Sequence, residues 1–128
     1  VWNFPVMKKG EFKTRVRIPE GSDEVYLLLN DRWMNPSDTV ARHECMYEVK
    51  LARKQLGIRD NQWHELTVSW DLNQKNPVAR IQVDGKKRNL RLNLKRKTLH
   101  GISYAHFMAC PAKENPGIEV EWVKASKK

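Results

Sequence analysis

Hydrophobic and polar residues alternate along much of the chain, which is the pattern of β-strands that bury one face. Between Phe12 and Ile18 the even positions are apolar or β-branched, and the odd positions are Lys13, Arg15 and Arg17. The same alternation recurs in 45–51, 65–70, 79–83 and 118–122, and in the run Leu90, Leu92 and Leu94. These segments predict strands with one face in a core and the other in water.

Two apolar segments and one turn complete the strand pattern. Glu24–Leu29 is nearly all apolar and precedes Asn30-Asp31, which predicts a strand covered on both faces and then a turn. Gly101–Met108 is the second apolar segment. Asp84-Gly85 lies between two alternating runs and predicts a tight hairpin, because this pair readily adopts the positive φ angles of such turns.

The predicted strands number about eight and are separated by segments rich in Gly, Pro, Asn and Asp. Helical spacing is weak and predicts single turns only, in 40–44 and 52–56. Half-polar strands need a second sheet against which to bury their apolar face. We therefore predict an all-β fold, an antiparallel two-sheet sandwich. No repeat period is visible, which argues against propellers and solenoids.

Length and composition favour one globular domain over residues 1–128. Of the 128 residues, 40% are hydrophobic, and five are tryptophan, which is enough apolar material to build a core. No apolar run approaches the roughly 20 residues that a membrane-spanning helix needs. The chain begins at Val1 without a signal-peptide pattern, so we expect a processed chain or a piece of a larger protein.

Two consecutive segments resemble a known family of domains. Asp60–Trp70 contains Trp63-His64 at the start of an alternating strand, and Ala79–Gly85 ends in Val83-Asp84-Gly85. This order and spacing resembles the signature of laminin-G-like and concanavalin-A-like jelly rolls. More narrowly, Gly101–Phe107 and Gly117–Val123 look like the end of the jelly-roll domain that accompanies sialidase-like propellers in bacterial polysaccharide-degrading enzymes.

The resemblance spans Phe12–Val123 and carries several expectations. It implies a jelly-roll fold and a non-catalytic role in a carbohydrate-active parent, either a glycoside hydrolase or a polysaccharide lyase. Complete jelly rolls of this type are usually longer, which leaves open whether one or two strands come from elsewhere in the parent. We favour a secreted or periplasmic location, although two cysteines, Cys45 and Cys110, do not decide the compartment.

The sequence offers no positive sign of catalysis. The E-x-D-x-x-E strand that the endoglucanases of this superfamily share is absent, and no Ser or Cys is spaced to suggest a triad. Glu119 and Glu121 share one strand face, where a solvated surface beside Lys124 explains them. His64 is structural in the family that the chain resembles, and His106 reads as a core or groove residue.

The net charge of +9 predicts attraction to acidic partners, although solubility alone would also explain it. The densest cluster of positive side chains surrounds the three leucines: Lys86, Lys87, Arg88, Arg91, Lys95, Arg96 and Lys97. If the leucines face inward, Arg91 and Lys95 point outward together, where they suit the carboxylates or sulfates of a glycan. Lys13, Arg15 and Arg17 would extend this surface if their strand is adjacent. The alternative is an edge strand that its charges protect from aggregation.

One loop combines an aromatic residue with polar side chains, as sugar-binding sites of β-sandwiches do. It contains Asp31, Arg32, Trp33 and Asn35, and Trp33 is the best candidate for a ligand contact. The alternative is a loop tryptophan folded over the end of the sandwich. Trp63, Trp70 and Trp122 lie in strand patterns and are predicted in the core. Asp31 and Asp38 are a weak candidate pair for calcium, so no cofactor is predicted.

Three hypotheses follow from these features. The first is a non-catalytic jelly-roll module that binds a polysaccharide, in particular an anionic one. The second is a structural or protein-interaction domain that braces a catalytic domain or another chain. The third, a nucleic-acid binder, is favoured by charge but lacks the interleaved exposed aromatic residues of stacking platforms.

Overall fold

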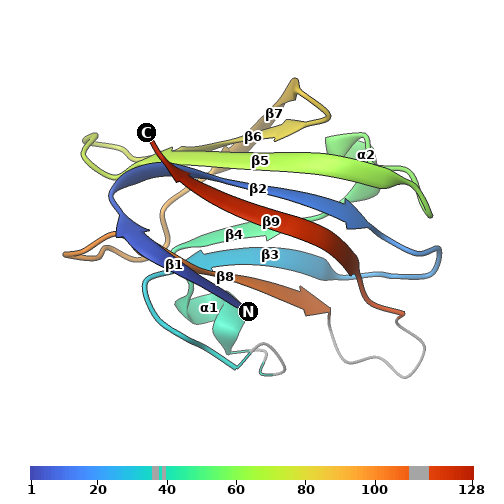
Figure 1. Ribbon diagram of the computed structural model, residues 1–128, viewed down its shortest axis with the longest axis horizontal. Helices are drawn as coiled ribbons and strands as arrows, with labels where there is room; N and C mark the ends of the chain where they lie inside the picture. The colour runs from blue at the N-terminus through green and yellow to red at the C-terminus, as the bar shows by residue number, and fades with distance from the viewer. Residues whose placement is uncertain (36–37, 39, 110–115) are drawn as a thin grey trace.

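The fold is a sandwich of two antiparallel sheets in a computed structural model that describes residues 1–35, 38, 40–109 and 116–128 (Figure 1). A four-stranded sheet has the order β1-β8-β3-β4, and a five-stranded sheet has the order β7-β6-β5-β2-β9. The strands are β1 (Trp2–Met7), β2 (Lys9–Arg17), β3 (Val25–Asn30), β4 (Tyr47–Lys50), β5 (Trp63–Asp71), β6 (Ala79–Val83), β7 (Lys86–Leu92), β8 (Ile102–Ala109) and β9 (Glu119–Lys127). This confirms the predicted all-β jelly-roll sandwich.

The core lies between the sheets and takes the apolar face of each alternating strand. In β2 the even positions Phe12, Thr14 and Val16 are buried, whereas Lys13 and Arg15 lie on the outer face. Every residue of β3 is buried, as its apolar sequence predicted. β1 was missed by the sequence analysis, because its burial is irregular and Pro5 interrupts it. It is an edge strand, where proline is tolerated.

The hairpin between β6 and β7 forms as predicted. Asp84 and Gly85 have φ angles of 52° and 77°, and Val83 pairs with Lys86 across the two-residue turn. β7 is an edge strand, and β2 is separated from it by β5 and β6. The expectation that β2 extends the positive surface of β7 is therefore wrong.

The outer face of the four-stranded sheet is covered by the connection from β3 to β4. This connection includes the single-turn helix α1 (Ala41–Glu44), and a second turn, α2 (Arg53–Leu56), follows β4. Both turns were predicted. A second apolar cluster forms where the connection packs on the sheet, made of Tyr26, Leu28, Ala41, Cys45 and Met108, with Met34 against it.

The tryptophans divide differently from the prediction. Trp70 is in the core, and its Nε1 donates to the Met7 carbonyl at 3.1 Å. Trp63 and Trp122 instead lie on the outer face of the five-stranded sheet, because their neighbours in sequence take the inward positions. Trp122 is 37% exposed, so its assignment to the core was wrong.

None of the helices in the described part of the chain is long and apolar enough to span a membrane.

Replacing Gly85 by valine tests the hairpin. A Cβ at Gly85 would have no neighbour within 4 Å, so the cost is backbone strain alone. Because a β-branched residue resists a positive φ, we expect Gly85→Val to lower the free energy of unfolding by at least about 1 kcal/mol in urea denaturation. Gly85→Asn is the control and should cost less, since asparagine tolerates this conformation. Equal stability of Gly85→Val and the wild type would contradict the turn.

Candidate functional site

A groove of about 380 Å³ lies at one end of the five-stranded sheet, between the loop before β6 and the chain that follows β7. We call it the basic groove; its lining residues are Lys75, Asn76, Pro77, Val78, Arg91, Asn93, Leu94, Lys95, Arg96 and Lys97. Five of these are Lys or Arg, and none of the described residues that line it is acidic. The structure thus brings the predicted residues Arg91 and Lys95 together, and it adds Lys75, which the sequence analysis missed.

Both walls of the basic groove are attached to the start of β4. The Tyr47 hydroxyl donates to the Pro77 carbonyl, and the Lys95 amide donates to the Met46 carbonyl at 2.8 Å. Tyr47 is fully buried, and burial, with the charge of Asp71, raises its pKa to about 12. The phenol therefore stays protonated and keeps donating. Two consecutive residues thus fix the spacing of the groove walls.

The cations of the groove differ in what they already bind. Lys95 donates to Glu48 at 3.1 Å and to the Arg42 carbonyl, and Arg91 donates to Asn93 at 2.8 Å. Burial raises the pKa of Glu48, but its hydrogen bonds from Lys95 and Arg42 outweigh this and lower the pKa overall. Lys75 and Lys97 have no ion-pair partner among the described residues, so their charges are available to a ligand.

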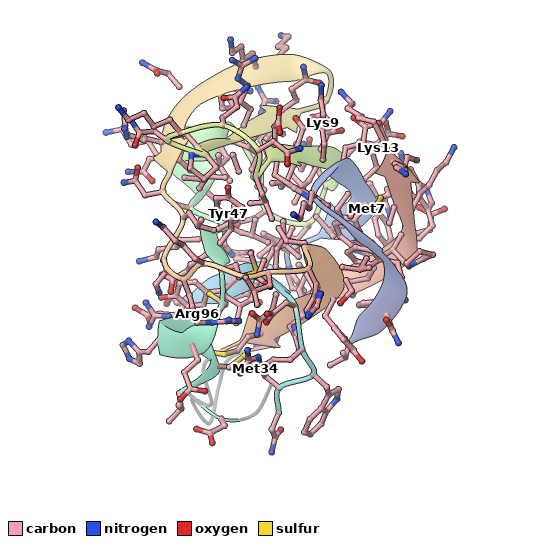
Figure 2. The ribbon with its side chains drawn as sticks, turned by 90° about the vertical axis from the view of Figure 1, so that its left-hand side faces the viewer. Met7, Lys9, Lys13, Met34, Tyr47 and Arg96 are labelled. Carbon is pink, nitrogen blue, oxygen red and sulfur yellow. The ribbon has the colours of Figure 1, made fainter. Side chains whose placement is uncertain are left out.

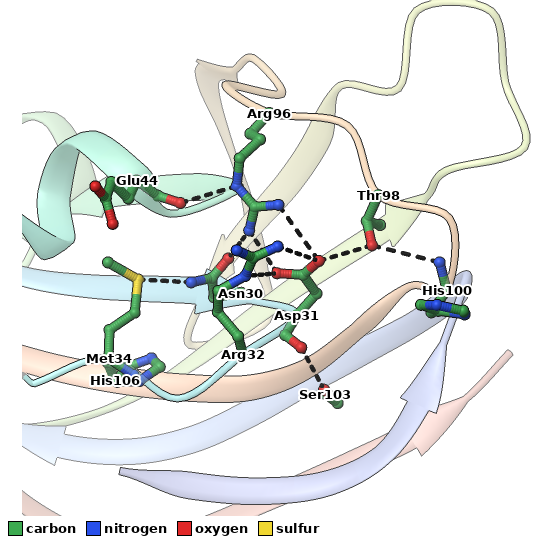
Figure 3. Close-up of polar contacts among 10 residues, drawn as sticks. All are labelled: Asn30, Asp31, Arg32, Met34, Glu44, Arg96, Thr98, His100, Ser103 and His106. Atoms are coloured by element: carbon green, nitrogen blue, oxygen red, sulfur yellow. Dashed lines mark hydrogen bonds and ion pairs between the residues drawn. The ribbon is translucent and has the colours of Figure 1, made fainter.

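Asp31 is the centre of a second polar cluster, next to the groove (Figure 3). Both of its oxygens accept from Arg96, and it also accepts from Arg32 at 3.0 Å and from Thr98 at 2.8 Å. The same Arg96 guanidinium reaches the side chain of Asn30 and donates to the Glu44 carbonyl at 3.1 Å. The carboxylate of Asp31 therefore positions the loop that it belongs to.

The charge of Asp31 is stabilised strongly. Partial burial would raise its pKa, but the hydrogen bonds from Arg96, Arg32 and Thr98 hold the pKa well below the ordinary value of 3.8. Asp31 is consequently ionised throughout the neutral and mildly acidic range.

The loop after β3 is also fixed at its other end. The Met34 amide donates to Nε2 of His106 at 3.0 Å, and His106 is fully buried. Burial and the nearby positive N-terminus lower the pKa of His106 to about 4, so the imidazole is neutral at pH 7 and can accept this bond. Arg96 and Met34 lie at the end of the molecule that carries α1 (Figure 2). His106 is the buried residue that the sequence analysis expected.

Trp33 lies between these two fixed points and is 61% exposed. The alternative of a tryptophan folded over the end of the sandwich does not describe this side chain. Arg32 and Asn35 are also exposed, and Arg32 pairs with Asp31. Participation of these residues in ligand binding stays a prediction.

The loop and the basic groove are continuous through Arg96 and Thr98. Arg96 lines the groove and pairs with Asp31. Thr98 donates to Asp31 and lines a neighbouring hollow that shares Lys75, Pro77, Leu94 and Lys97 with the groove. The loop that carries Trp33 is therefore attached to the wall of the groove at Asp31.

Arg15 and Arg17 of β2 are neutralised on the outer face of the five-stranded sheet. Arg15 pairs with Glu121 at 2.7 Å and Arg17 with Glu119 at 2.5 Å, and both guanidinium groups lie over the Trp63 ring. This agrees with the surface role expected for Glu119 and Glu121. The part of this face formed by β2 and β9 therefore carries paired charges.

Metal ligands and reactive thiols are two further kinds of group that this region could contain. No group of three His, Cys, Asp or Glu among the described residues is arranged to hold a metal ion. Asp31 faces two guanidinium groups, which would repel calcium. Cys45 is a buried free thiol, and burial raises its pKa to about 11. Cys110 lies outside the described residues.

Comparison with known proteins supports the fold without a match in sequence. No protein-family model and no curated protein matches the chain. Among solved structures, the chain is similar to a tetrameric galectin from the ball sponge Cinachyrella sp., with a TM-score of 0.56 and 10% sequence identity. The match covers 97% of this chain and 96% of the galectin chain. The sandwich is therefore a galectin-like jelly roll, to which the described residues contribute nine strands.

Asp31→Asn tests the cluster. We expect a loss of about 2 kcal/mol in the free energy of unfolding at pH 7, because the variant leaves Arg96 without its charged partner. The lowered pKa of Asp31 stabilises the fold above the ordinary carboxyl pKa of 3.8, and this contribution is lost as the pH falls below it. The difference in the free energy of unfolding between Asp31→Asn and the wild type, measured by urea denaturation, should therefore be smaller at pH 3 than at pH 7.

Glu119→Gln is the matched control for Asp31→Asn, since it breaks an exposed pair. It should change stability by less than about 1 kcal/mol. If Asp31→Asn lowers the free energy of unfolding only slightly at pH 7, or by the same amount at pH 3 as at pH 7, the cluster does not hold the loop.

Proposed function

We propose that this chain is a non-catalytic carbohydrate-binding module whose ligand is an anionic polysaccharide. The observation that carries the proposal is the basic groove together with the loop that bears the exposed Trp33, which the Asp31–Arg96 pair attaches to the groove wall. The fold agrees with it, because a galectin is among the solved structures that the chain resembles. A fold does not determine a function, and the residues of the site are therefore what support a glycan ligand.

Trp33 supplies the apolar part of the proposed site. A side chain that is 61% exposed on a loop fixed by Asp31 and His106 offers a ring that a ligand can cover at little cost in conformational freedom. The alternating apolar and polar faces of a sugar suit an indole surrounded by donors such as Arg32 and Asn35.

The basic groove supplies the charge selectivity. Lys75 and Lys97 have no ion-pair partners in the described part of the chain, and Arg91 presents a fork that suits carboxylate or sulfate oxygens. A neutral glycan would leave these charges unused, which is the reason to propose an anionic one. As part of the same proposal, the module belongs to a larger polysaccharide-active protein and tethers it to its substrate.

A binding measurement with paired variants tests the proposal. The probes are chondroitin sulfate, polygalacturonate and neutral dextran, with single-stranded and duplex DNA as nucleic-acid controls. We expect an anionic glycan to bind more tightly than dextran and DNA. Trp33→Ala should weaken binding at least about tenfold at both low and high salt, because apolar burial is not screened. The control Trp122→Ala removes an exposed tryptophan from the opposite face and should bind as the wild type does.

The charge contribution is tested by Arg91→Gln combined with Lys97→Gln. Affinity should fall at about 50 mM salt, and the loss should shrink at about 500 mM, where surface charges are screened. Lys13→Gln combined with Lys124→Gln removes the same charge from β2 and β9, at the other side of the five-stranded sheet from β7, and serves as the control. Retention of no glycan at low salt would refute the proposal and favour the bracing role. Tighter binding of DNA at matched charge would favour the nucleic-acid hypothesis.

A further inference from the structure

A second positively charged pocket, of about 530 Å³, lies at the other end of β7, beside α2. Its cations are Arg53, Lys54, Arg59, Lys86 and Arg88, and Asp84 is the one carboxylate among its described lining residues. Arg53 is paired with Asp60. The other four cations have no ion pair among the described residues.

Asp84 offsets only one of the positive charges of this pocket, and both of its oxygens accept hydrogen bonds from groups other than the pocket cations. Oδ2 accepts from Nδ1 of His64 at 2.6 Å, and Oδ1 accepts from the Glu65 amide at 2.9 Å. The other ring nitrogen of His64 accepts from the Arg59 amide at 3.0 Å, so the imidazole is neutral with its proton on Nδ1. The His64–Asp84 pair therefore contributes one negative charge against the cations.

Arg88 is the cation of this pocket whose side chain is directed inward and has a buried donor without a partner in the described part of the chain. It pairs with the inward-facing Ile81, so its side chain takes the inner face of the sheet, in phase with Leu90 and Leu92. Its Nε is buried and has no hydrogen-bond partner among the described residues. A buried donor without a partner is costly unless a bound group satisfies it.

The backbone at Gly57 makes room for this guanidinium. Gly57 ends α2 with a φ of 66°, and a Cβ there would lie 2.6 Å from Nη2 of Arg88. A glycine thus serves two purposes, the left-handed turn and the close approach of the guanidinium.

We propose that the Arg88 pocket binds one oxyanion group, a sulfate or a carboxylate, and is a second anchor for the anionic polysaccharide. The first part stands on the pocket alone, and the second rests on the proposed function. β7 runs from Lys86 in this pocket to Leu92 beside the basic groove, and a shallow hollow lined by Lys87, Asn89 and Arg91 follows it. The two anchors are roughly 20 Å apart along the strand, within reach of one oligosaccharide.

The pocket itself is tested with inorganic sulfate, by NMR of the Arg88 Nε–H group and the Gly57 amide. Sodium sulfate is titrated against sodium chloride at equal ionic strength. We expect a saturable shift in the wild type. Arg88→Gln should weaken sulfate binding at least about tenfold, as reported by Gly57, because a forked charged donor is lost. Lys87→Gln, on the opposite face of the same strand, should bind sulfate as the wild type does.

Two further measurements keep the outcome interpretable. Thermal unfolding in sulfate-free buffer checks that Arg88→Gln is folded, and Arg88→Lys should bind sulfate with intermediate affinity because it keeps the charge without the fork. Chemical shifts that change linearly with sulfate concentration, or that are reduced equally in Lys87→Gln and Arg88→Gln, would refute the proposed anion site.

Chondroitin sulfate and polygalacturonate then distinguish a sulfate from a carboxylate as the group that binds. Arg88→Gln should weaken binding of the preferred polymer by at least about fivefold, whereas Lys13→Gln, on β2, should bind the polymer as the wild type does. Sulfate binding without any polymer binding would leave the pocket standing and refute the proposed function. Polymer binding that Arg88→Gln does not weaken would refute the second anchor and leave the proposed function standing.

Discussion

The guanidinium group of Arg96 is the contact on which the candidate site depends. It joins the loop after β3, through Asn30 and Asp31, to the end of α1, through the Glu44 carbonyl, while its own segment forms a wall of the basic groove. One side chain therefore fixes three segments that are far apart in sequence. Because the pair is shielded and bidentate, its loss would leave a charge without a partner and release the loop that carries Trp33.

The strands of the jelly roll hold the segments that the Arg96 guanidinium connects. Met46 and Tyr47, at the start of β4, hold the two groove walls from below, and His106 on β8 holds the loop at Met34. The opposite outer face instead pairs its arginines with Glu119 and Glu121. Arg15 and Arg17 are thus neutralised, whereas Lys75 and Lys97 in the groove have no ion-pair partner among the described residues.

The alternation of side chains was sufficient to predict the sandwich, because a period of two places each residue of β2, β5 and β6 on a definite face. β1 escaped prediction because Pro5 and an irregular register hide its pattern. Extending the strand pairing away from the Asp84-Gly85 turn would have placed Lys75 near Asn93. The alternation that Arg88 shares with Leu90 likewise indicated that the Arg88 side chain faces inward. The sequence analysis used neither pattern. The pair of Asp31 with Arg96 spans 65 residues, and nothing local in the sequence specifies it.

The central claim is that the loop of Trp33 and the basic groove bind one anionic glycan together. Titration of the isotope-labelled protein with a defined anionic oligosaccharide, followed by NMR, tests it most directly. We expect the signals of the Trp33 indole N–H, the amides around Lys75 and those of 91–97 to shift together with one dissociation constant, while the Trp122 indole signal does not move. Shifts centred on Trp122 and Trp63, or separate dissociation constants for the Trp33 loop and the groove, would contradict it.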